Sequence, residues 1–109
     1  MEGIPGIKNL REGISANIWE YGDTAVVSDI WITENLRGVE GRRILKDLEN
    51  QFNTVVLVNV SNGKFRNYLA GRMGYTPYYW APGCIPILYK TKEAGFDIIS
   101  FLKEEIENK

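Results

Sequence analysis

The sequence predicts a mixed α/β (α+β) fold, in which a sheet of about five strands contains a central βαβ unit and packs with three helices. Three observations predict it. Residues 24–33 and 54–60 are rich in the β-branched residues that favour strands. Residues 40–50, between them, repeat apolar residues at the three- and four-residue spacing of a helix with one buried face. A strand, a helix and a buried strand in this order imply two parallel strands with a right-handed crossover.

The hairpin and the first helix come first in the chain. Residues 14–20 and 24–33 are predicted to be strands joined by a glycine-containing turn, and the even-numbered Val26, Ile30 and Ile32 are expected to share one face. The helix at 40–50 is expected to bury Gly41, Ile44, Leu45 and Leu48. The near-continuous apolar run at 54–60 is typical of a strand buried on both faces.

The second half of the chain is predicted to contain two helices and two strands. A helix at 64–73 would end at Gly74, which suits a left-handed cap. Strands are expected at 76–80 and 84–90, where Pro77 and Pro86 indicate edge positions or bulges. In the helix at 64–73, Phe65, Leu69 and Met73 are expected to form the buried face. A last helix is predicted at about 94–107, with a buried face made of Ile98, Ile99, Leu102 and Ile106.

Length and composition favour one globular domain over residues 1–109. Hydrophobic residues make up 44% of the 109 residues and charged residues 25%, which is ordinary for such a domain. Residues 1–12 are interpreted as a loose N-terminal arm or an edge segment, and residues 93–109 as a C-terminal helix. The formal net charge of −1 argues against a surface made wholly for nucleic acid.

Several kinds of chemistry are excluded by composition. The chain has no histidine, which removes Ser-His-Asp catalysis, Cys-His catalysis and histidine-based metal sites. Its one cysteine, Cys84, cannot form an internal disulfide, which fits a reducing compartment. There is no apolar run of ~20 residues and no signal-peptide pattern at the N-terminus. We therefore expect a cytoplasmic protein without a membrane partner or a bound metal.

The segment that links residues 24–33 to the helix at 40–50 has the features of an anion site. A glycine-bearing turn that opens a helix leaves backbone N–H groups unpaired, and the helix dipole adds partial positive charge there. Gly38 and Gly41 would let a phosphate approach the backbone, and Arg37, Arg42 and Arg43 would add positive charge. The alternative interpretation is structural: the glycines serve the turn and the helix packing, and the arginines are solvated.

Residues 29–45, Asp-Ile-Trp-Ile-Thr-Glu-Asn-Leu-Arg-Gly-Val-Glu-Gly-Arg-Arg-Ile-Leu, resemble the central motif of the GNAT superfamily of N-acetyltransferases. In that family a strand precedes an Arg/Gln-x-x-Gly-x-Gly/Ala loop that cradles the coenzyme A pyrophosphate, and a helix beginning Gly-x-x-Leu-Leu follows. The family then has a buried strand, an Asn-bearing turn, a helix and a Gly-Phe pair. The run at 54–60, Asn62, the helix at 64–73 and Gly74-Tyr75 are similar in order, so that the resemblance covers about residues 14–90.

This resemblance implies an acetyl-CoA-dependent N-acetyltransferase, with acetyl-CoA as co-substrate and a small-molecule or protein amine as acceptor. The amine would attack the thioester directly in a ternary complex. The residues implied to hold the coenzyme are Trp31, Ile32 and Thr33 through main-chain atoms, Arg37, Gly38, Val39, Glu40, Gly41 and Arg42 in the loop, and Asn62. Candidates for proton transfer are Asp29, Glu34 and Tyr68. The structural alternatives are solvated carboxylates at the strand end and a helix cap at Asn62.

The chain also departs from the family pattern. Aligned on Arg37, the two glycine positions of the loop hold Glu40 and Arg42. Aligned on Gly41 instead, Val39 takes the first glycine position and Leu36 the Arg/Gln position. The tyrosine that protonates the leaving thiolate in the family falls at Ala70. Residues 1–12 are too short for the strand and two helices that shape the family's acceptor site. The chain therefore resembles short phage- or mobile-element-type members, in which we expect the C-terminal helix to cover the face those helices usually cover.

Two other functions remain open. The chain could be a degenerate GNAT-like module that binds a protein partner through a cluster of aromatic residues, Tyr75, Tyr78, Tyr79 and Trp80. The alternative interpretation is that these aromatic side chains pack in the core and at the sheet edge. Nucleic-acid binding through the arginine-rich loop and the aromatics is the third and weaker hypothesis, because the near-neutral net charge argues against nucleic acid as a partner. An open sheet edge makes a homodimer a further expectation.

Overall fold

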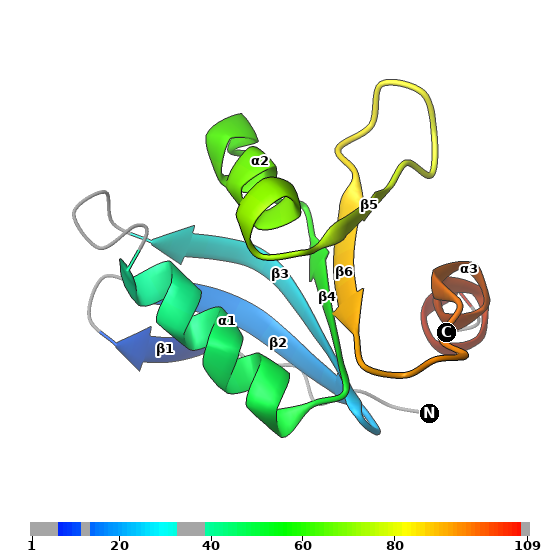
Figure 1. Cartoon of the computed structure of the whole chain (residues 1–109), viewed down its shortest axis with the longest axis horizontal. Coiled ribbons are helices and arrows are strands. Elements are labelled where there is room, and N and C mark those ends of the chain that lie inside the picture. The colour runs from blue at the N-terminus through cyan, green and yellow to red at the C-terminus, as the bar shows by residue number, and fades with distance from the viewer. Residues whose placement is uncertain (1–6, 12–13, 33–38, 108–109) are drawn as a thin grey trace.

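The computed structural model describes residues 7–11, 14–32 and 39–107. In chain order the elements are β1 (Ile7–Arg11), β2 (Ile14–Tyr21), β3 (Thr24–Ile32), α1 (Val39–Gln51), β4 (Thr54–Val58), α2 (Gly63–Arg72), β5 (Thr76–Tyr78), β6 (Ile87–Thr91), α3 (Ile98–Phe101) and the π-helical turn η2 (Leu102–Glu107). Figure 1 shows the sheet with α1 and α2 on the near side and α3 beside β6.

The strands form one mixed sheet in the order β1-β2-β3-β4-β6-β5. Of the six strands described, only β3 and β4 are parallel neighbours, and α1 connects them, so the predicted βαβ unit and mixed α+β class are confirmed. The sheet has one strand more than the expected five, because residues 7–11 pair with β2 as an edge strand. For residues 7–11, this corresponds to the edge-segment interpretation; residues 1–6 and 12 lie outside the described residues.

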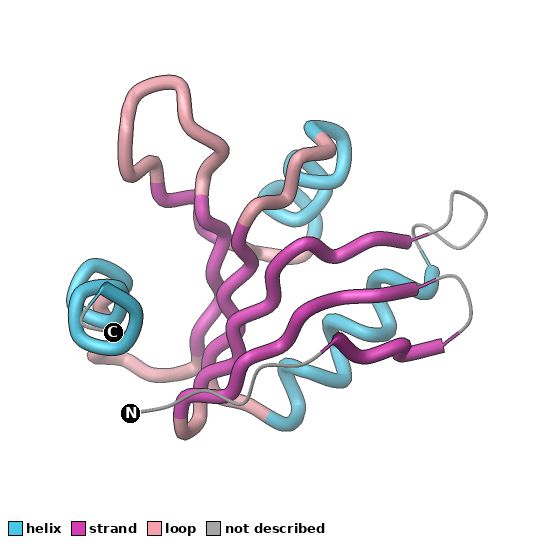
Figure 2. The backbone as a smooth tube through the Cα atoms, turned by 180° about the vertical axis from the view of Figure 1, so that it is seen from behind, coloured by secondary structure: helices cyan, strands magenta, loops and turns pink. Residues whose placement is uncertain are grey.

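The core lies on both faces of the sheet. On one face, Leu45 and Leu48 of α1 and Leu69 of α2 pack with Val27 and Val55. On the other face, Ile98 of α3 packs with residues of β3, β4 and β6, which are Val26, Val56 and Ile87. Strand β4 is therefore buried on both sides, as its continuous apolar run predicts. Figure 2 shows α3 standing apart from α1 and α2, across the strands.

A β-bulge in β3 changes which of its side chains lie on each face of the sheet. Asn17 of β2 pairs with Ser28 of β3, but Ser15 pairs with Trp31, so two steps along β2 match three along β3. Such a β-bulge reverses the alternation of side chains beyond it. The expected shared face of Val26, Ile30 and Ile32 is therefore wrong: Ile30 packs on the face of Val27, opposite Val26.

The C-terminal helix also differs from the prediction. It begins at Ile98 rather than near residue 94, because Asp97 accepts hydrogen bonds from the Ile99 amide and the Ser100 hydroxyl and so caps it there. Ile99 was expected in the buried stripe, but its side chain is 45% exposed. Phe96 and Phe101 pack instead, with ring centroids 5.8 Å apart.

Strands β5 and β6 are shorter than predicted. β5 ends at Tyr78 and β6 begins at Ile87. Pro77 lies in β5, which is the edge strand next to β6, as a proline without an N–H donor requires. Pro86 lies just before β6, outside the ladder.

Gly74, which follows α2, is predicted to stabilise the C-terminal end of this helix. It has a φ of +80°, and the Tyr75 amide beside it donates to the Leu69 carbonyl at 3.0 Å. We expect Gly74→Ala to lower the free energy of unfolding by about 1–2 kcal/mol, because an L side chain is disfavoured in the left-handed region. Gly71→Ala is the matched control, since Gly71 lies inside α2 with nothing within 4 Å of an added Cβ. It should be neutral or stabilising by up to about 1 kcal/mol in urea titrations. Equal losses in both variants would contradict this role of Gly74.

Candidate functional site

Strands β3 and β4 are paired over only part of β3. The parallel ladder runs from Thr24 opposite Thr54 to Ser28 opposite Val58 and then stops. β3 continues to Ile32, still paired with β2 on its other side. Figure 1 shows the two strands diverging from their common start. Among the described residues, residues 29–32 therefore have no strand partner on the β4 side; we call this backbone the β3 edge segment.

The bulge explains where the divergence begins. The extra residue of β3 lies between Ser28 and Trp31, immediately after the last pair with β4. A bulge bends its strand and increases the local twist, so β3 turns away from β4 at this point. Bulges of this kind are common beside functional sites, because they end strand pairing and expose backbone groups.

The loop after β4 is held in a defined shape opposite the β3 edge segment. Asn59, the first residue beyond β4, has a φ of +61°, a conformation that asparagine tolerates better than most residues. The Arg66 guanidinium donates to the carbonyls of Val60 and Ser61, at 2.7 and 2.9 Å. Asn62 caps α2 by accepting from the Phe65 amide at 3.0 Å. The capping role considered for Asn62 is therefore confirmed.

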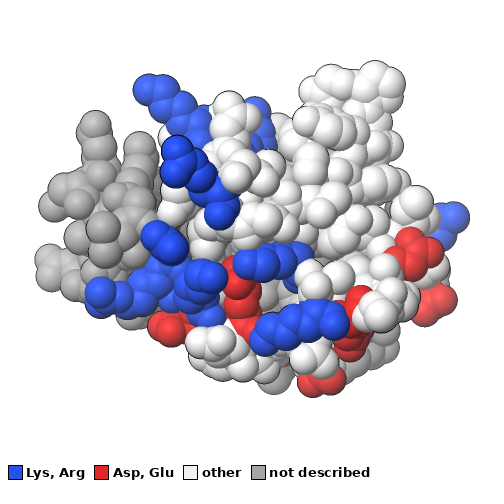
Figure 3. All heavy atoms as spheres, in the orientation of Figure 1, with Lys and Arg blue, Asp and Glu red and all other residues white. Residues whose placement is uncertain are grey.

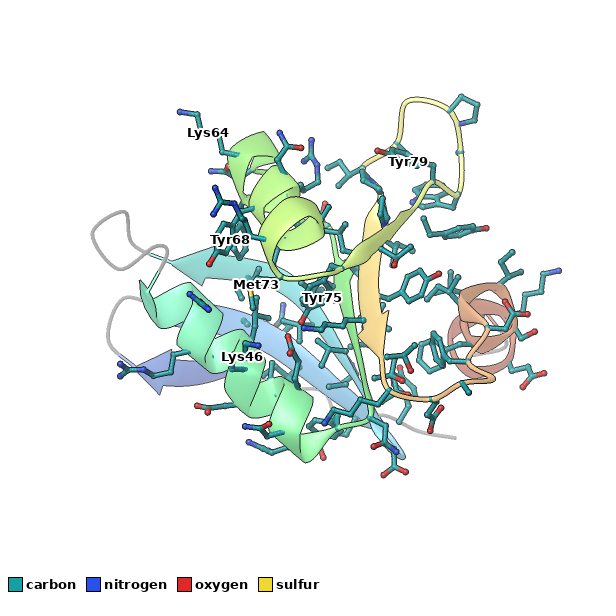
Figure 4. The ribbon with its side chains drawn as sticks, viewed as in Figure 1. Lys46, Lys64, Tyr68, Met73, Tyr75 and Tyr79 are labelled. Atoms are coloured by element: carbon teal, nitrogen blue, oxygen red, sulfur yellow. The ribbon has the colours of Figure 1, made fainter. Side chains whose placement is uncertain are left out.

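Tyr68 is the only one of the three proton-transfer candidates whose side chain is described. It is half-buried on α2 and packs against the core cluster that includes Leu69 and Ile30. In Figure 4 its ring points from α2 towards β3 and α1. Of the other two candidates, Asp29 has only its backbone described, in β3, and Glu34 lies outside the described residues.

Apart from Asn62 at the start of α2, the predicted coenzyme residues lie in β3, in α1, or among residues 33–38, which the structure does not describe. Trp31 and Ile32 contribute backbone to the β3 edge segment. Thr33, Arg37 and Gly38 lie outside the described residues. The first turn of α1 contains Val39, Glu40, Gly41 and Arg42, of which only Arg42 has a described side chain, and it is exposed.

Basic side chains gather over the two helices that flank this region. Arg42, Arg43 and Lys46 are exposed on α1, and Lys64 and Arg72 are exposed on α2. Figure 3 shows Lys and Arg side chains along this face of the molecule, next to an uncharged area over the β5–β6 hairpin. These side chains provide positive charge on the two helices beside the β3 edge segment, alongside the exposed Asp47 of α1, and such charge attracts an anionic ligand.

A buried polar network that the sequence analysis missed joins α1 to β6. Glu49 is 9% exposed; one carboxylate oxygen accepts from the Tyr75 hydroxyl at 3.0 Å and the other from the Lys90 ammonium at 3.0 Å. The Lys92 ammonium donates to the Glu49 carbonyl. A cavity of about 40 Å³ beside the network has room for ordered water but not for a substrate. The position of Glu49, next to Leu48 and four residues after Leu45, could have indicated that it is buried.

The aromatic residues of the second half do not form one cluster. Tyr75 is buried with Glu49 on the α1–α2 face, and Tyr78 packs with the cluster on the opposite face. Tyr79 and Trp80 are 66% and 59% exposed in the loop after β5. The expectation of a joint cluster is therefore wrong, because residues 75 and 78 are on opposite faces of the sheet.

Neither protein-family models nor curated proteins provide a match to this chain. The helices of the described residues include none that is both long and apolar enough to span a membrane. In the same part of the chain, no three His, Cys, Asp or Glu side chains are grouped as metal ligands would be.

The Glu49 network is predicted to make stability fall at alkaline pH. Burial, followed by the charge of Glu49 and its hydrogen bond, raises the pKa of Tyr75 well above 10.0. As the pH rises through about 10, the unfolded chain releases this proton while the folded chain keeps it. The free energy of unfolding should therefore fall by about 1.4 kcal/mol per pH unit from this group.

The test compares Tyr75→Phe with the wild type in urea titrations between about pH 7 and 11. At neutral pH the variant should lose about 1–2 kcal/mol, because Glu49 loses a donor. The difference in free energy of unfolding between Tyr75→Phe and the wild type should become smaller above about pH 10. Tyr79→Phe, at an exposed position, is the control and should follow the wild type. Parallel pH curves for Tyr75→Phe and the wild type would contradict the role given to Tyr75.

Proposed function

We propose that this protein is an acetyl-CoA-dependent N-acetyltransferase of the GNAT type, which works in a reducing, cytoplasmic compartment. The observation that carries the proposal is the divergence of two parallel strands beside the first turn of the crossover helix. The resemblance of residues 29–45 to the GNAT motif concerns this same strand, turn and helix.

The proposed binding mode uses backbone groups of two kinds. The pantetheine arm, an extended chain with two amides, would hydrogen-bond to the β3 edge segment as an added strand does. The pyrophosphate would lie at the N-terminus of α1, where unpaired N–H groups and the helix dipole favour an anion. Arg42 at this end adds positive charge. The topology supports the same arrangement, because α1 follows β3 in the βαβ unit and so begins at the carboxyl end of the two parallel strands.

The proposed reaction is a direct acyl transfer. The nitrogen of the acceptor amine attacks the thioester carbonyl, the carbon–sulfur bond breaks, and the products are an amide and coenzyme A. One proton leaves the amine and one reaches the thiolate. Positioning of the two substrates and hydrogen bonding of the carbonyl by a backbone N–H supply most of the rate enhancement. Tyr68, which points from α2 towards β3, is the described side chain best placed to protonate the thiolate.

A second candidate function is a binding module without catalysis. It is favoured by the exposure of Tyr79 and Trp80, since adjacent exposed aromatics are frequent hot spots of protein interfaces. In that case coenzyme A would leave the thermal midpoint unchanged, and Trp80→Ala would abolish partner binding.

Coenzyme binding is tested by the thermal midpoint with and without acetyl-CoA, with ATP as the control ligand. At a concentration ~100-fold above the dissociation constant, binding adds about 2.7 kcal/mol, which raises the midpoint by several degrees. Arg42→Glu should reduce the shift without unfolding the protein, because an acidic residue in the first turn suits the helix dipole. Lys103→Glu, exposed in η2 on the other side of the sheet, should leave it unchanged. The absence of a coenzyme-specific shift in a folded protein would refute the proposal.

Tyr68→Phe tests the proton donor. Removing a general acid should lower kcat by about 10²-fold or more while the thermal shift with acetyl-CoA stays the same. The release of free thiol from acetyl-CoA, measured with a panel of primary amines, provides the rate. Tyr78→Phe, half-buried on the opposite face, is the matched control. An unchanged kcat in Tyr68→Phe would remove Tyr68 from the mechanism but not the coenzyme site.

A further inference from the structure

The charges of this chain are unevenly distributed. None of its 14 acidic residues lies in the stretch from Asn50 to Lys92, although five of the 13 basic residues do. This stretch contains β4, α2, β5 and β6. The net charge of −1 therefore conceals an acid-free region within an otherwise acidic chain, and it is a poor guide to what this region binds.

Two of these five basic residues are directed to solvent on α2. The other three serve the fold: Arg66 donates to the loop after β4, and Lys90 and Lys92 contact Glu49. Lys64 and Arg72, near the two ends of α2, are exposed and have no ion-pair partner among the described residues. They are available to attract an anion.

The loop between β5 and β6 adds exposed aromatic rings to the same end of the molecule. Figure 1 shows this loop and α2 both reaching beyond the sheet in one direction. Residues 75–89 contain no charged side chain, and the face in Figure 3 shows no acidic side chain over this region. Tyr79 and Trp80 are 66% and 59% exposed. We call Lys64, Arg72, Tyr79 and Trp80 the α2–hairpin surface; in Figure 4 Lys64 lies on the side of α2 away from the loop that carries Tyr79, so a ligand that reaches both must extend across α2.

The acidic side chains lie elsewhere. An open groove of about 460 Å³ between the β2–β3 turn and α3 is lined by Asp23, Glu93, Asp97 and Glu104. A polyanion approaching the molecule is therefore repelled from that groove and attracted to the α2–hairpin surface.

We propose that the α2–hairpin surface binds single-stranded nucleic acid. Lys64 and Arg72 attract the phosphates, and unpaired bases stack on Tyr79 and Trp80. Proteins that bind single strands without sequence preference combine these same two elements, positive charge along the backbone path and aromatic platforms for the bases.

The exposed side chains of the loop favour a nucleic acid over an anionic membrane. Exposed Trp and Tyr rings also suit a membrane interface, but the aliphatic side chains of this loop that would enter the lipid are not exposed: Ile85 is half-buried, and Pro86 and Ile87 are buried. The tip is also closed on itself, because the Cys84 amide donates to the Ala81 carbonyl at 3.3 Å. The rings of Tyr79 and Trp80 are what it presents, and flat rings suit stacking on bases.

Anisotropy of fluorescein-labelled oligo-dT and oligo-rU 20-mers, titrated with the full chain between about 50 and 200 mM salt, tests the proposal. We expect saturable binding that weakens with salt. Lys64→Glu with Arg72→Glu should weaken binding at least about tenfold and reduce the slope of log affinity against log salt by about 0.7 for each phosphate that is no longer neutralised. Trp80→Ala should weaken binding about tenfold with little change in salt dependence, since stacking is not ionic.

Two controls match these variants in exposure. Lys103→Glu reverses a charge in η2, and Ile99→Ala removes an exposed apolar side chain from α3. Both should bind like the wild type. The proposal is overturned by absence of binding at the lowest salt, by equal weakening in Lys103→Glu, by wild-type affinity in Trp80→Ala, or by binding to phosphatidylserine vesicles without binding to either oligonucleotide. Tyr79 and Trp80 lie outside the proposed coenzyme site, so Trp80→Ala should weaken oligonucleotide binding without changing the thermal shift with acetyl-CoA, and each proposal can fail alone.

Discussion

The parallel pairing of β3 with β4 is the constraint on which the rest of the structure depends. β4 is buried on both faces, with Val55 and Leu57 towards α1 and α2 and Val56 towards α3. A parallel neighbour requires a crossover, and α1 supplies it with Leu45 fully buried. Both halves of the core therefore meet at one five-residue strand. Substitutions in β4 should affect the two faces together, whereas those in α1 or α3 act mainly on one.

The same pairing creates the candidate site by ending early. The ladder stops at Ser28 and Val58, and the bulge that follows turns β3 away while β2 continues to hold it. Among the described strands, the β3 edge segment thus has no partner on the β4 side and is paired with β2 on the other. Extended ligands bind well to such an edge, because the backbone is already in the conformation that pairing needs. The Arg66 hydrogen bonds to the Val60 and Ser61 carbonyls likewise hold the facing loop, which begins at Asn59 in its left-handed conformation.

The charged groups that stabilise the fold differ from those that we propose to bind ligands. Glu49, Lys90 and Lys92 are used inside the molecule, where they tie the end of α1 to β6. A buried carboxylate without these partners would be costly, so this network limits how α1 can move relative to the sheet. Arg42, Lys46, Lys64 and Arg72 remain at the surface. The proposals for a coenzyme and for a nucleic acid rest on these surface groups and on neighbouring backbone, which leaves the network free to serve the fold.

The sequence by itself determined the class of fold, the order of the elements from β2 onwards and the polarity of most of their faces. These features follow from local spacing: the three-residue spacing of Leu45 and Leu48 predicts a helix with one buried face, and the apolar run from Thr54 predicts a strand buried on both faces. Gly74 and Asn62 were also predictable, because caps depend on adjacent residues. Only the tertiary structure decided the bulge in β3, the exposure of Ile99 and the partnership of Glu49 with Tyr75 and Lys90. The bulge and the Glu49 network each depend on residues far away in the chain. The spacing of residues within one segment does not identify such a partner, because strand register and buried polar contacts are set only when distant segments pack together.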